Sequence, residues 1–186
     1  MGPQHRIHLA NSGHASRFSQ DRAGLKTGRA NFAFPGMPMR IRKANPADVT
    51  AVITCAHGAY QIYVERIGRN PAPMMADFAA LIERGIVFVG EDAAGDLCGF
   101  VVFYPRGDSM HLENVAVAPG KQGHGYGKRL VAFVEAEAIG QGFTSVDLYT
   151  NEKMTENQHL YPRLGYEEIE RRQEDGFNRI YYRKPL

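Results

Sequence analysis

Cysteine and long hydrophobic runs are scarce in this chain of 186 residues. The two cysteines, Cys55 and Cys98, lie far apart, and the seven histidines do not cluster with cysteines or carboxylates at ligand spacing. We therefore expect neither a disulfide framework nor a metal cofactor. No apolar stretch approaches the roughly 18 residues of a membrane helix, so no membrane partner is expected. Free cysteines without such a span are typical of a reducing compartment, and we expect a cytoplasmic protein.

Acidic residues are nearly missing from the start of the chain. Residues 1–43 contain eight Lys and Arg but only one acid, Asp21. Residues 1–36 are rich in Gly, Ser, Asn, Arg and His and show no sustained apolar period, so we expect a disordered basic leader. Three explanations stay open: a passenger tail, a start misplaced upstream of Met37 or Met39, and an organelle-targeting peptide. The first two are favoured over targeting.

The rest of the chain, residues 37–186, is expected to fold as one domain. After residue 43, fourteen basic and nineteen acidic side chains make it mildly acidic, which disfavours a nucleic-acid partner. Apolar patterns and turn residues predict strands at 39–43, 86–91, 97–104, 110–118, 145–150, 167–172 and 177–183. They predict helices from Asn45-Pro46 to Gly68 and at 77–84, 126–139 and 155–164. This mixed order predicts an α+β fold with a sheet flanked by helices.

The most informative run is residues 112–128, where a strand meets a glycine-rich turn and continues as an amphipathic helix. Three alternating glycines between residues 123 and 127 let backbone amides approach a ligand closely. Unpaired N–H groups at the helix start, together with the helix dipole, favour a phosphate there. Two common phosphate motifs do not fit. Lys128 stands where a dinucleotide fingerprint needs its third glycine, and Gln122 and Arg129 occupy the Gly and Ser/Thr positions of a P-loop.

The run resembles the coenzyme A loop of the GNAT family of N-acetyltransferases. That loop has Arg or Gln, a Gly three residues later, and Gly or Ala after two more. Gln122, Gly125 and Gly127 match all three positions. Residues 115–119 resemble the family's fourth strand with its following proline, and residues 160–166 resemble its Leu-Tyr element that ends in Gly and an aromatic residue. The resemblance covers about four-fifths of the chain.

The resemblance implies an acyl-CoA N-acyltransferase fold with a mixed, mostly antiparallel, twisted sheet whose central strands, 110–118 and 145–150, splay apart. It implies acetyl-coenzyme A as co-substrate, with the pantetheine arm in the gap and the pyrophosphate on the loop amides. Asn157 is expected to supply a contact that an asparagine makes in many relatives. His124 is expected to face solvent without a catalytic role. The implied cofactor-binding residues are Val115, Ala116, Val117, Gln122, Gly123, His124, Gly125, Tyr126, Gly127, Lys128 and Asn157.

Acetyl transfer needs a group that removes a proton from the amine, because an alkyl ammonium has a pKa of about 10, and an acid for the leaving thiolate. Tyr161 matches the family's usual acid. For the base, alternation places His111 and Glu113 on the strand face of Val115 and Val117. In the resemblance, these are positions where relatives acting on histones or arylalkylamines carry Glu or His. Both stay candidates, with Glu113 as base or amine anchor.

The first two helices and their loop are expected to cover the acceptor site. Tyr60, Tyr63, Arg66 and Arg69 form either an aromatic and cationic wall for an amine with an acidic or polar tail, or a packed pair of tyrosines with solvated arginines. We favour a small-molecule primary amine as acceptor. An acetyltransferase acting on a protein lysine or N-terminus would need an open groove between residues 69–75 and the final hairpin. A non-catalytic acyl-coenzyme A sensor is a third alternative, and a homodimer is considered because dimers are frequent among look-alikes.

Overall fold

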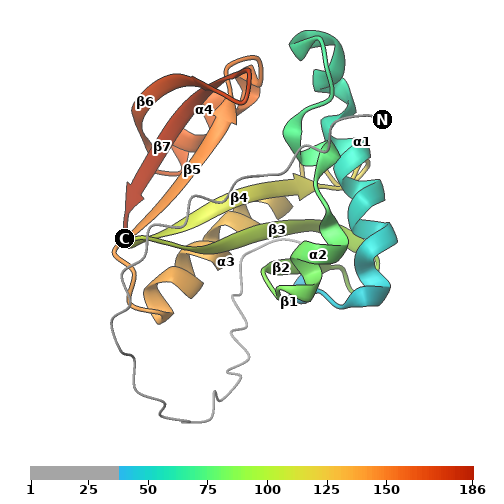
Figure 1. Cartoon of the computed structure of the whole chain (residues 1–186). Helices are drawn as coiled ribbons and strands as arrows, with labels where there is room; N and C mark the ends of the chain where they lie inside the picture. Colours follow the sequence, from blue (N-terminus) through green and yellow to red (C-terminus); the bar gives the residue numbers. More distant parts are fainter. Residues whose placement is uncertain (1–37) are drawn as a thin grey trace, which may run out of the picture. The chain divides into compact units, whose positions relative to one another are not determined.

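The structure is a computed structural model that describes residues 38–186, so the expected leader, residues 1–36, lies outside the described residues. In the described part, seven strands form one sheet in the order β1-β2-β3-β4-β5-β7-β6 (Figure 1). The strands are β1 (Arg40–Lys43), β2 (Val87–Glu91), β3 (Leu97–Arg106), β4 (Ser109–Val117), β5 (Ser145–Asn151), β6 (Glu167–Glu174) and β7 (Phe177–Pro185). The helices are α1 (Val49–Ile67), α2 (Phe78–Glu83), α3 (Tyr126–Gly140) and α4 (Thr155–Arg163), with short 3-10 helices η1 (Pro46–Asp48) and η2 (Ala72–Met75).

The sheet is mixed and mostly antiparallel, which confirms the predicted α+β class. Within residues 38–186, β4 and β5 are the one parallel pair of neighbours, and every other pair is antiparallel. The order of strands and helices along the chain is also the predicted one. None of the helices described for residues 38–186 has both the length and the apolar character that crossing a membrane requires.

Local sequence signals set both ends of the first long helix. The side chain of Asn45 accepts a hydrogen bond from the Ala47 amide, and the side chain of Asp48 accepts one from the Asn45 amide. This reciprocal capping box opens η1, which leads directly into α1. At the other end, Gly68 takes a left-handed conformation with φ of 80° and ends the helix.

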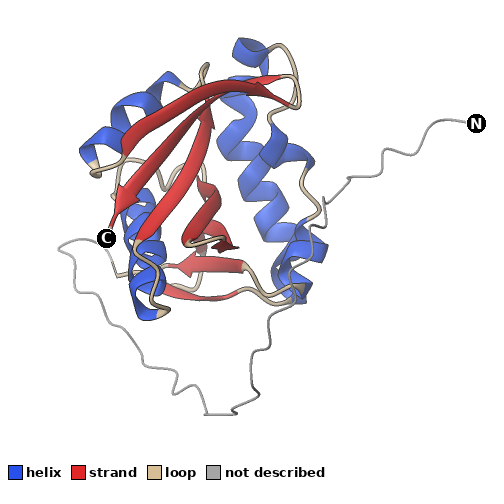
Figure 2. Cartoon of the chain, turned by 60° about the vertical axis from the view of Figure 1, so that its left-hand side comes forward, coloured by secondary structure: helices blue, strands red, loops and turns tan. Residues whose placement is uncertain are grey.

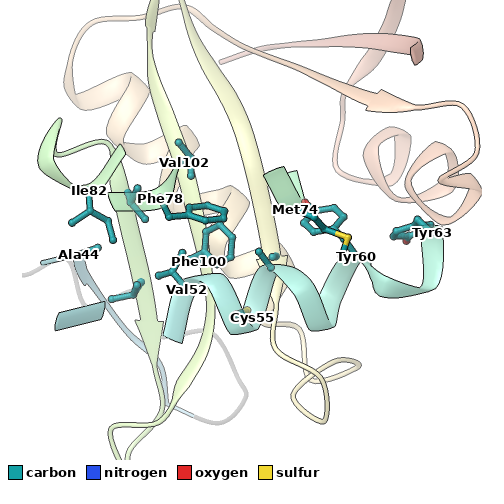
Figure 3. Close-up of a cluster of buried hydrophobic side chains, with 14 of the residues drawn as sticks. Ala44, Val52, Cys55, Tyr60, Tyr63, Met74, Phe78, Ile82, Phe100 and Val102 are labelled. Carbon is teal, nitrogen blue, oxygen red and sulfur yellow. The ribbon is translucent and has the colours of Figure 1, made fainter. Parts of the chain in front are cut away.

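Helices cover both faces of the sheet (Figure 2). Alternate residues of β3 pack into two different apolar clusters. Phe100 and Val102 join the cluster with α1 and α2, which Figure 3 shows. Val101 and Phe103 join the cluster with α3 and α4 on the opposite face. The central strands are therefore buried on both sides, which holds the strands next to the site in a rigid frame.

The sheet opens between β4 and β5. These strands pair only from Met110 with Val146 to Leu112 with Leu148, although β4 continues to Val117 and β5 to Asn151. Beyond Leu112, β4 stays paired with β3 while β5 follows β7, and the two halves of the sheet diverge (Figure 1). This divergence confirms the splayed central strands that the resemblance implied.

Candidate active site

A β-bulge in β4 aims Glu113 toward the opening. Val102 pairs with Asn114 and the next residue of β3, Phe103, pairs with Leu112, so Glu113 is the extra residue. The prediction that His111 and Glu113 share a face with Val115 and Val117 is wrong, because the bulge shifts the alternation by one residue. Val115 and Val117 pack against the α3 cluster.

His111 and Glu113 lie on the opposite face of the sheet from these valines. The ring of His111 lies 5.4 Å from that of Tyr104 and 5.8 Å from that of Tyr149, measured between centroids. Asn114, which follows the bulge, accepts a hydrogen bond of 2.6 Å from the Tyr60 hydroxyl of α1. The α1 face of β4 therefore carries the polar groups, and the α3 face carries the apolar ones.

Glu113 is the centre of a hydrogen-bonded cluster. Its Oε1 accepts from the Tyr149 hydroxyl at 2.5 Å, and its Oε2 lies 3.0 Å from the Tyr104 hydroxyl and 3.1 Å from His111 Nε2. Burial acts to raise the pKa of the Glu113 carboxyl, but the hydrogen bonds with His111, Tyr149 and Tyr104 outweigh it and lower the pKa to about 2. The carboxyl is therefore ionised at neutral pH.

A cavity of about 190 Å³ lies at the opening of the sheet. Its lining comes from α1, η2, β4, β5, α4 and β7, together with the start of α3. The predicted site residues that line it are Tyr60, Tyr63, Glu113, Val115, Ala116, Val117, Gln122, Gly127, Asn157 and Tyr161. The structure therefore brings the predicted acid, the predicted amine anchor and the predicted pantetheine strand to one space.

Tyr161 has a buried ring, and its side chain lines this cavity. Its ring packs 5.6 Å from that of Tyr182 and 5.8 Å from that of Tyr166, between centroids. Burial, with smaller contributions from Tyr63 and Tyr182, raises the pKa of Tyr161 well above its ordinary value. The hydroxyl stays protonated at neutral pH, and among residues 38–186 it has no hydrogen-bonding partner. It is free to donate to a ligand.

The glycine-rich turn presents open backbone at the start of α3. Gly123 and Gly125 both have φ of 80°, and a side chain at either position would meet no atom within 4 Å. Gly125 is the N-cap of α3 and adds no side-chain hydrogen bond, so the first amides of the helix stay available. This arrangement fits the pyrophosphate of a coenzyme A molecule.

Side chains of the same turn are engaged elsewhere. His124 is exposed, as predicted, and its Nδ1 lies 2.8 Å from the Gln122 carbonyl oxygen. Lys121 pairs with Asp92 of the β2–β3 turn at 2.6 Å, so its charge is neutralised next to the loop. The side chain of Tyr126 is buried, and only its backbone is left for a ligand. In this turn, main-chain amides at the start of α3 are therefore available to a ligand, while the side chains of Lys121 and Tyr126 are engaged elsewhere.

The predicted acceptor wall is only half assembled. Tyr60 and Tyr63 line the cavity at the end of the α1 core cluster (Figure 3). Arg66 instead pairs with Glu156 of α4 at 2.8 Å, and Arg69 stacks on Phe177 with its guanidinium carbon 3.4 Å from the ring centroid. Neither arginine lines the cavity, so the structure agrees better with the alternative of packed tyrosines than with a wall that includes both arginines.

Sequence reasoning missed residues of β5 and β7 that line the same cavity. Tyr149 follows directly after the last residue of β5 that pairs with β4, and its hydroxyl binds Glu113. Arg179 lies with its guanidinium carbon 4.1 Å from the Tyr149 ring centroid, and Phe177 carries the stacked Arg69. Their spacing in the sequence shows nothing unusual. Only the pairing of β5 with β4 and β7 reveals them.

The opened sheet and the free helix-start amides match what the resemblance implied, and comparisons with known proteins agree. Residues 83–168 match the family model of the acetyltransferase (GNAT) domain. This match, over 86 of the 186 residues, identifies a GNAT acetyltransferase domain in the chain.

Solved structures show the same fold. A PaiA N-acetyltransferase from Thermoplasma acidophilum, in complex with coenzyme A, is 17% identical with a TM-score of 0.67, and the match covers 81% of this chain and 100% of that one. The ribosomal-protein-S18-alanine N-acetyltransferase from Escherichia coli is 22% identical with a TM-score of 0.64, covering 80% and 94%. A nourseothricin acetyltransferase is 22% identical with a TM-score of 0.60, covering 79% and 98%. Their names include protein and small-molecule acceptors, so the fold alone does not choose the acceptor.

Proposed function

We propose that this enzyme transfers the acetyl group of acetyl-coenzyme A to a primary amine of a small molecule. The observation that carries the proposal is the shared cavity. It is lined by the end of β4 that has no β5 neighbour, by the Tyr161 hydroxyl and by the ionised Glu113. A thioester on the strand and an amine at the carboxylate would meet in this space.

The donor would lie along the opening of the sheet. Residues 115–117 would bind the pantetheine arm, because β4 loses β5 as a neighbour beyond Leu112. Loop amides from Gln122 to Lys128 would hold the pyrophosphate. Asn157, which lines the cavity and donates to the Thr150 hydroxyl at 2.9 Å, is proposed as a further contact to the donor.

Glu113 is proposed as the anchor of the acceptor amine. A carboxylate offers about four acceptor positions, and Tyr149, Tyr104 and His111 use three of them. The remaining position can accept an N–H of an ammonium group. A carboxyl with a pKa of about 2 is a weak base, so the proton of the ammonium leaves to solvent, through water, while Glu113 orients the nitrogen. His111 is buried and holds Glu113 instead of reaching the cavity.

The proposed acetyl transfer accounts for every proton and every bond that changes. The ammonium first loses one proton to water, and the free amine then attacks the thioester carbonyl. A C–N bond forms and the C–S bond breaks. The second proton lost from nitrogen ends on the coenzyme A sulfur, with the Tyr161 hydroxyl donating to that sulfur as it departs. Ammonium and thioester thus become amide, thiol and one released proton.

Closure of the groove favours a small acceptor over a protein chain. A protein substrate would need an open passage between residues 69–75 and the final hairpin. Arg69 bridges that passage by stacking on Phe177 and by donating a hydrogen bond of 2.9 Å to the Asp175 carbonyl. The Arg66–Glu156 pair adds a second bridge from α1 to α4.

A library of small amines and peptides, assayed with a thiol reagent for coenzyme A release, tests this function. We expect amine-dependent release for small amines and weak release for peptides. Preferential turnover of peptides would replace the acceptor assignment with a protein acceptor. Binding of acetyl-coenzyme A without turnover of any amine would favour a sensor, and the catalytic assignment would be rejected.

A further inference from the structure

The acceptor side of the cavity has an unusual balance of charge. Among the described residues that line the cavity, Glu113 is the one anionic side chain and Arg179 is the one cationic side chain. Arg66 and Arg69, which lie next to this region in sequence, are engaged outside it. An acceptor would therefore meet an ionised carboxylate, and Arg179 is the one cation of the lining that could balance an acidic tail.

The charge of Arg179 is already balanced by carboxylates of the final hairpin. Its Nη1 makes a close ion pair with Glu174, and its Nη2 lies 3.2 Å from Asp175 Oδ2. Its guanidinium also stacks on the Tyr149 ring, and its side chain is 10% exposed. A carboxylate or phosphate on the acceptor would have to displace these partners, while it also approached the like charge of Glu113.

Two hydroxyl groups of the acceptor side, those of Tyr60 and Tyr149, are also used internally. The Tyr60 hydroxyl lies 2.6 Å from Asn114 Oδ1 and 3.0 Å from the Val115 carbonyl oxygen. The Tyr149 hydroxyl donates to Glu113. These tyrosines therefore present ring faces instead of hydroxyl groups to a ligand. A sugar rich in hydroxyl groups would lose its hydration against these two rings without gaining hydrogen bonds from their hydroxyl groups.

The rest of this wall is largely apolar. Tyr63, Ile67, Pro71 and Phe177 line it, and Arg69 covers Phe177 from outside. The whole cavity measures about 190 Å³ and must also hold the acetyl-thioester end of the donor. Pockets for small molecules are commonly roughly 300–1,000 Å³, so the space left for an acceptor suits a compact apolar body.

We infer that the acceptor is a compact monoamine with an aromatic or short alkyl body and without a carboxylate, phosphate or sugar group. This inference rests on the proposed function, because it names the substrate class of the same cavity. The ammonium would bind at Glu113, and the apolar body would pack on the rings of Tyr60, Tyr63 and Phe177. The cavity would thus disfavour acceptors that carry a second charged group and favour acceptors with an apolar ring.

A matched pair of amines isolates the decisive feature. 2-Phenylethylamine and L-phenylalanine have the same ring and amine and differ by one carboxylate. We expect kcat/KM for 2-phenylethylamine to exceed that for L-phenylalanine by about 100-fold, because the added carboxylate lacks a free partner beside Glu113. Glucosamine should be similarly poor. Equal or better turnover of L-phenylalanine or glucosamine would overturn the inference while leaving acetyl transfer in place.

A cation added to the wall provides a second test. Ala72 lines the cavity from η2, so Ala72→Arg should raise the relative kcat/KM for L-phenylalanine by about 10-fold. Met75→Arg is the matched control on the same short helix, because Met75 is exposed and does not line the cavity. An unchanged ratio in Ala72→Arg, or an equal change in both variants, would contradict the charge argument.

A binding measurement separates failure of the inference from failure of the proposed function. If no amine is turned over, calorimetry of the same pair with the coenzyme A complex still measures selection by the cavity. Tighter binding of 2-phenylethylamine would support the inference although the catalytic proposal had failed. Equal or tighter binding of L-phenylalanine, or no binding of either amine, would reject it.

Discussion

The hydroxyl of Tyr149 donates a hydrogen bond of 2.5 Å to Glu113, and the two residues follow directly after the last pair between β4 and β5. One side chain therefore joins the two halves of the sheet where they separate. The same bond helps to keep the Glu113 carboxylate ionised beside the cavity. The contact therefore joins the two halves of the sheet and also sets the charge of the residue that we propose as the amine anchor.

Replacing Tyr149 with Phe should weaken both effects. Loss of the donor should raise the pKa of Glu113 from about 2 toward the ordinary glutamate value. Because the folded-state pKa is depressed, the bond stabilises the fold above the unfolded pKa, and this contribution disappears as the pH falls toward about 2. Carbon NMR of labelled glutamate side chains measures the pKa, and urea unfolding measures the stability.

Tyr181→Phe is the matched control for this change. Its hydroxyl also donates a hydrogen bond of 2.5 Å to a glutamate, Glu174, but this pair lies on the final hairpin. We expect kcat/KM for the amine to fall about 10-fold in Tyr149→Phe and to change little in the control, because only the first variant frees Glu113. An unshifted Glu113 pKa in Tyr149→Phe would show that the hydroxyl does not tune the carboxyl.

Tyr161→Phe should impair chemistry more than donor binding. We expect kcat to fall about 100-fold or more, with the Kd for acetyl-coenzyme A nearly unchanged, because the departing sulfur loses its donor. Tyr166→Phe is a suitable control, since the buried Tyr166 hydroxyl has no hydrogen-bond partner within residues 38–186. Steady-state kinetics and calorimetry give both quantities. A variant with wild-type kcat would exclude Tyr161 as the acid.

Gly125→Val should prevent binding of acetyl-coenzyme A. The φ of 80° disfavours a β-branched residue, and the added methyl groups would occupy the open space above the amides. Gly142→Val carries similar backbone strain, with φ of 83°, at the far end of α3 and serves as the control. Calorimetry should show binding to the control alone. Unchanged affinity in Gly125→Val would place the pyrophosphate elsewhere.

The Arg69 bridge predicts a change in acceptor size. Arg69→Ala should raise kcat/KM for a peptide amine about 10-fold relative to a small amine, because the stacked guanidinium no longer closes the passage beside Phe177. Arg163→Ala is the control, since Arg163 is exposed and bonds to a carbonyl of its own helix. Equal peptide turnover by the wild type and Arg69→Ala would remove the closure argument.

Local patterns in the sequence were sufficient to predict the helices, the strands and the glycine-rich loop. Asn45 and Gly68 mark the ends of the first helical region because capping and left-handed turns depend on nearby residues. The loop from Gln122 to Gly127 is equally local. Its glycines have the open backbone that their spacing indicated.

The acceptor side depended on long-range pairing, which local patterns do not encode. The extra residue at Glu113 places Val115 and Val117 on the sheet face opposite to that of His111. This bulge depends on the register between β3 and β4, which the sequence of β4 alone does not show. Tyr149 became part of the site only through the register of β5 with β4. Arg69 does not line the cavity because its guanidinium stacks on the ring of Phe177 in β7.

The central claim is that donor and acceptor meet between Tyr161 and Glu113 in the opened sheet. The most direct test is the rate of coenzyme A release with a small monoamine, measured for the wild type and for the double variant Glu113→Gln, Tyr161→Phe. We predict amine-dependent release by the wild type and a loss of about 1,000-fold in the double variant. A double variant that binds acetyl-coenzyme A and releases coenzyme A as fast as the wild type would contradict the claim.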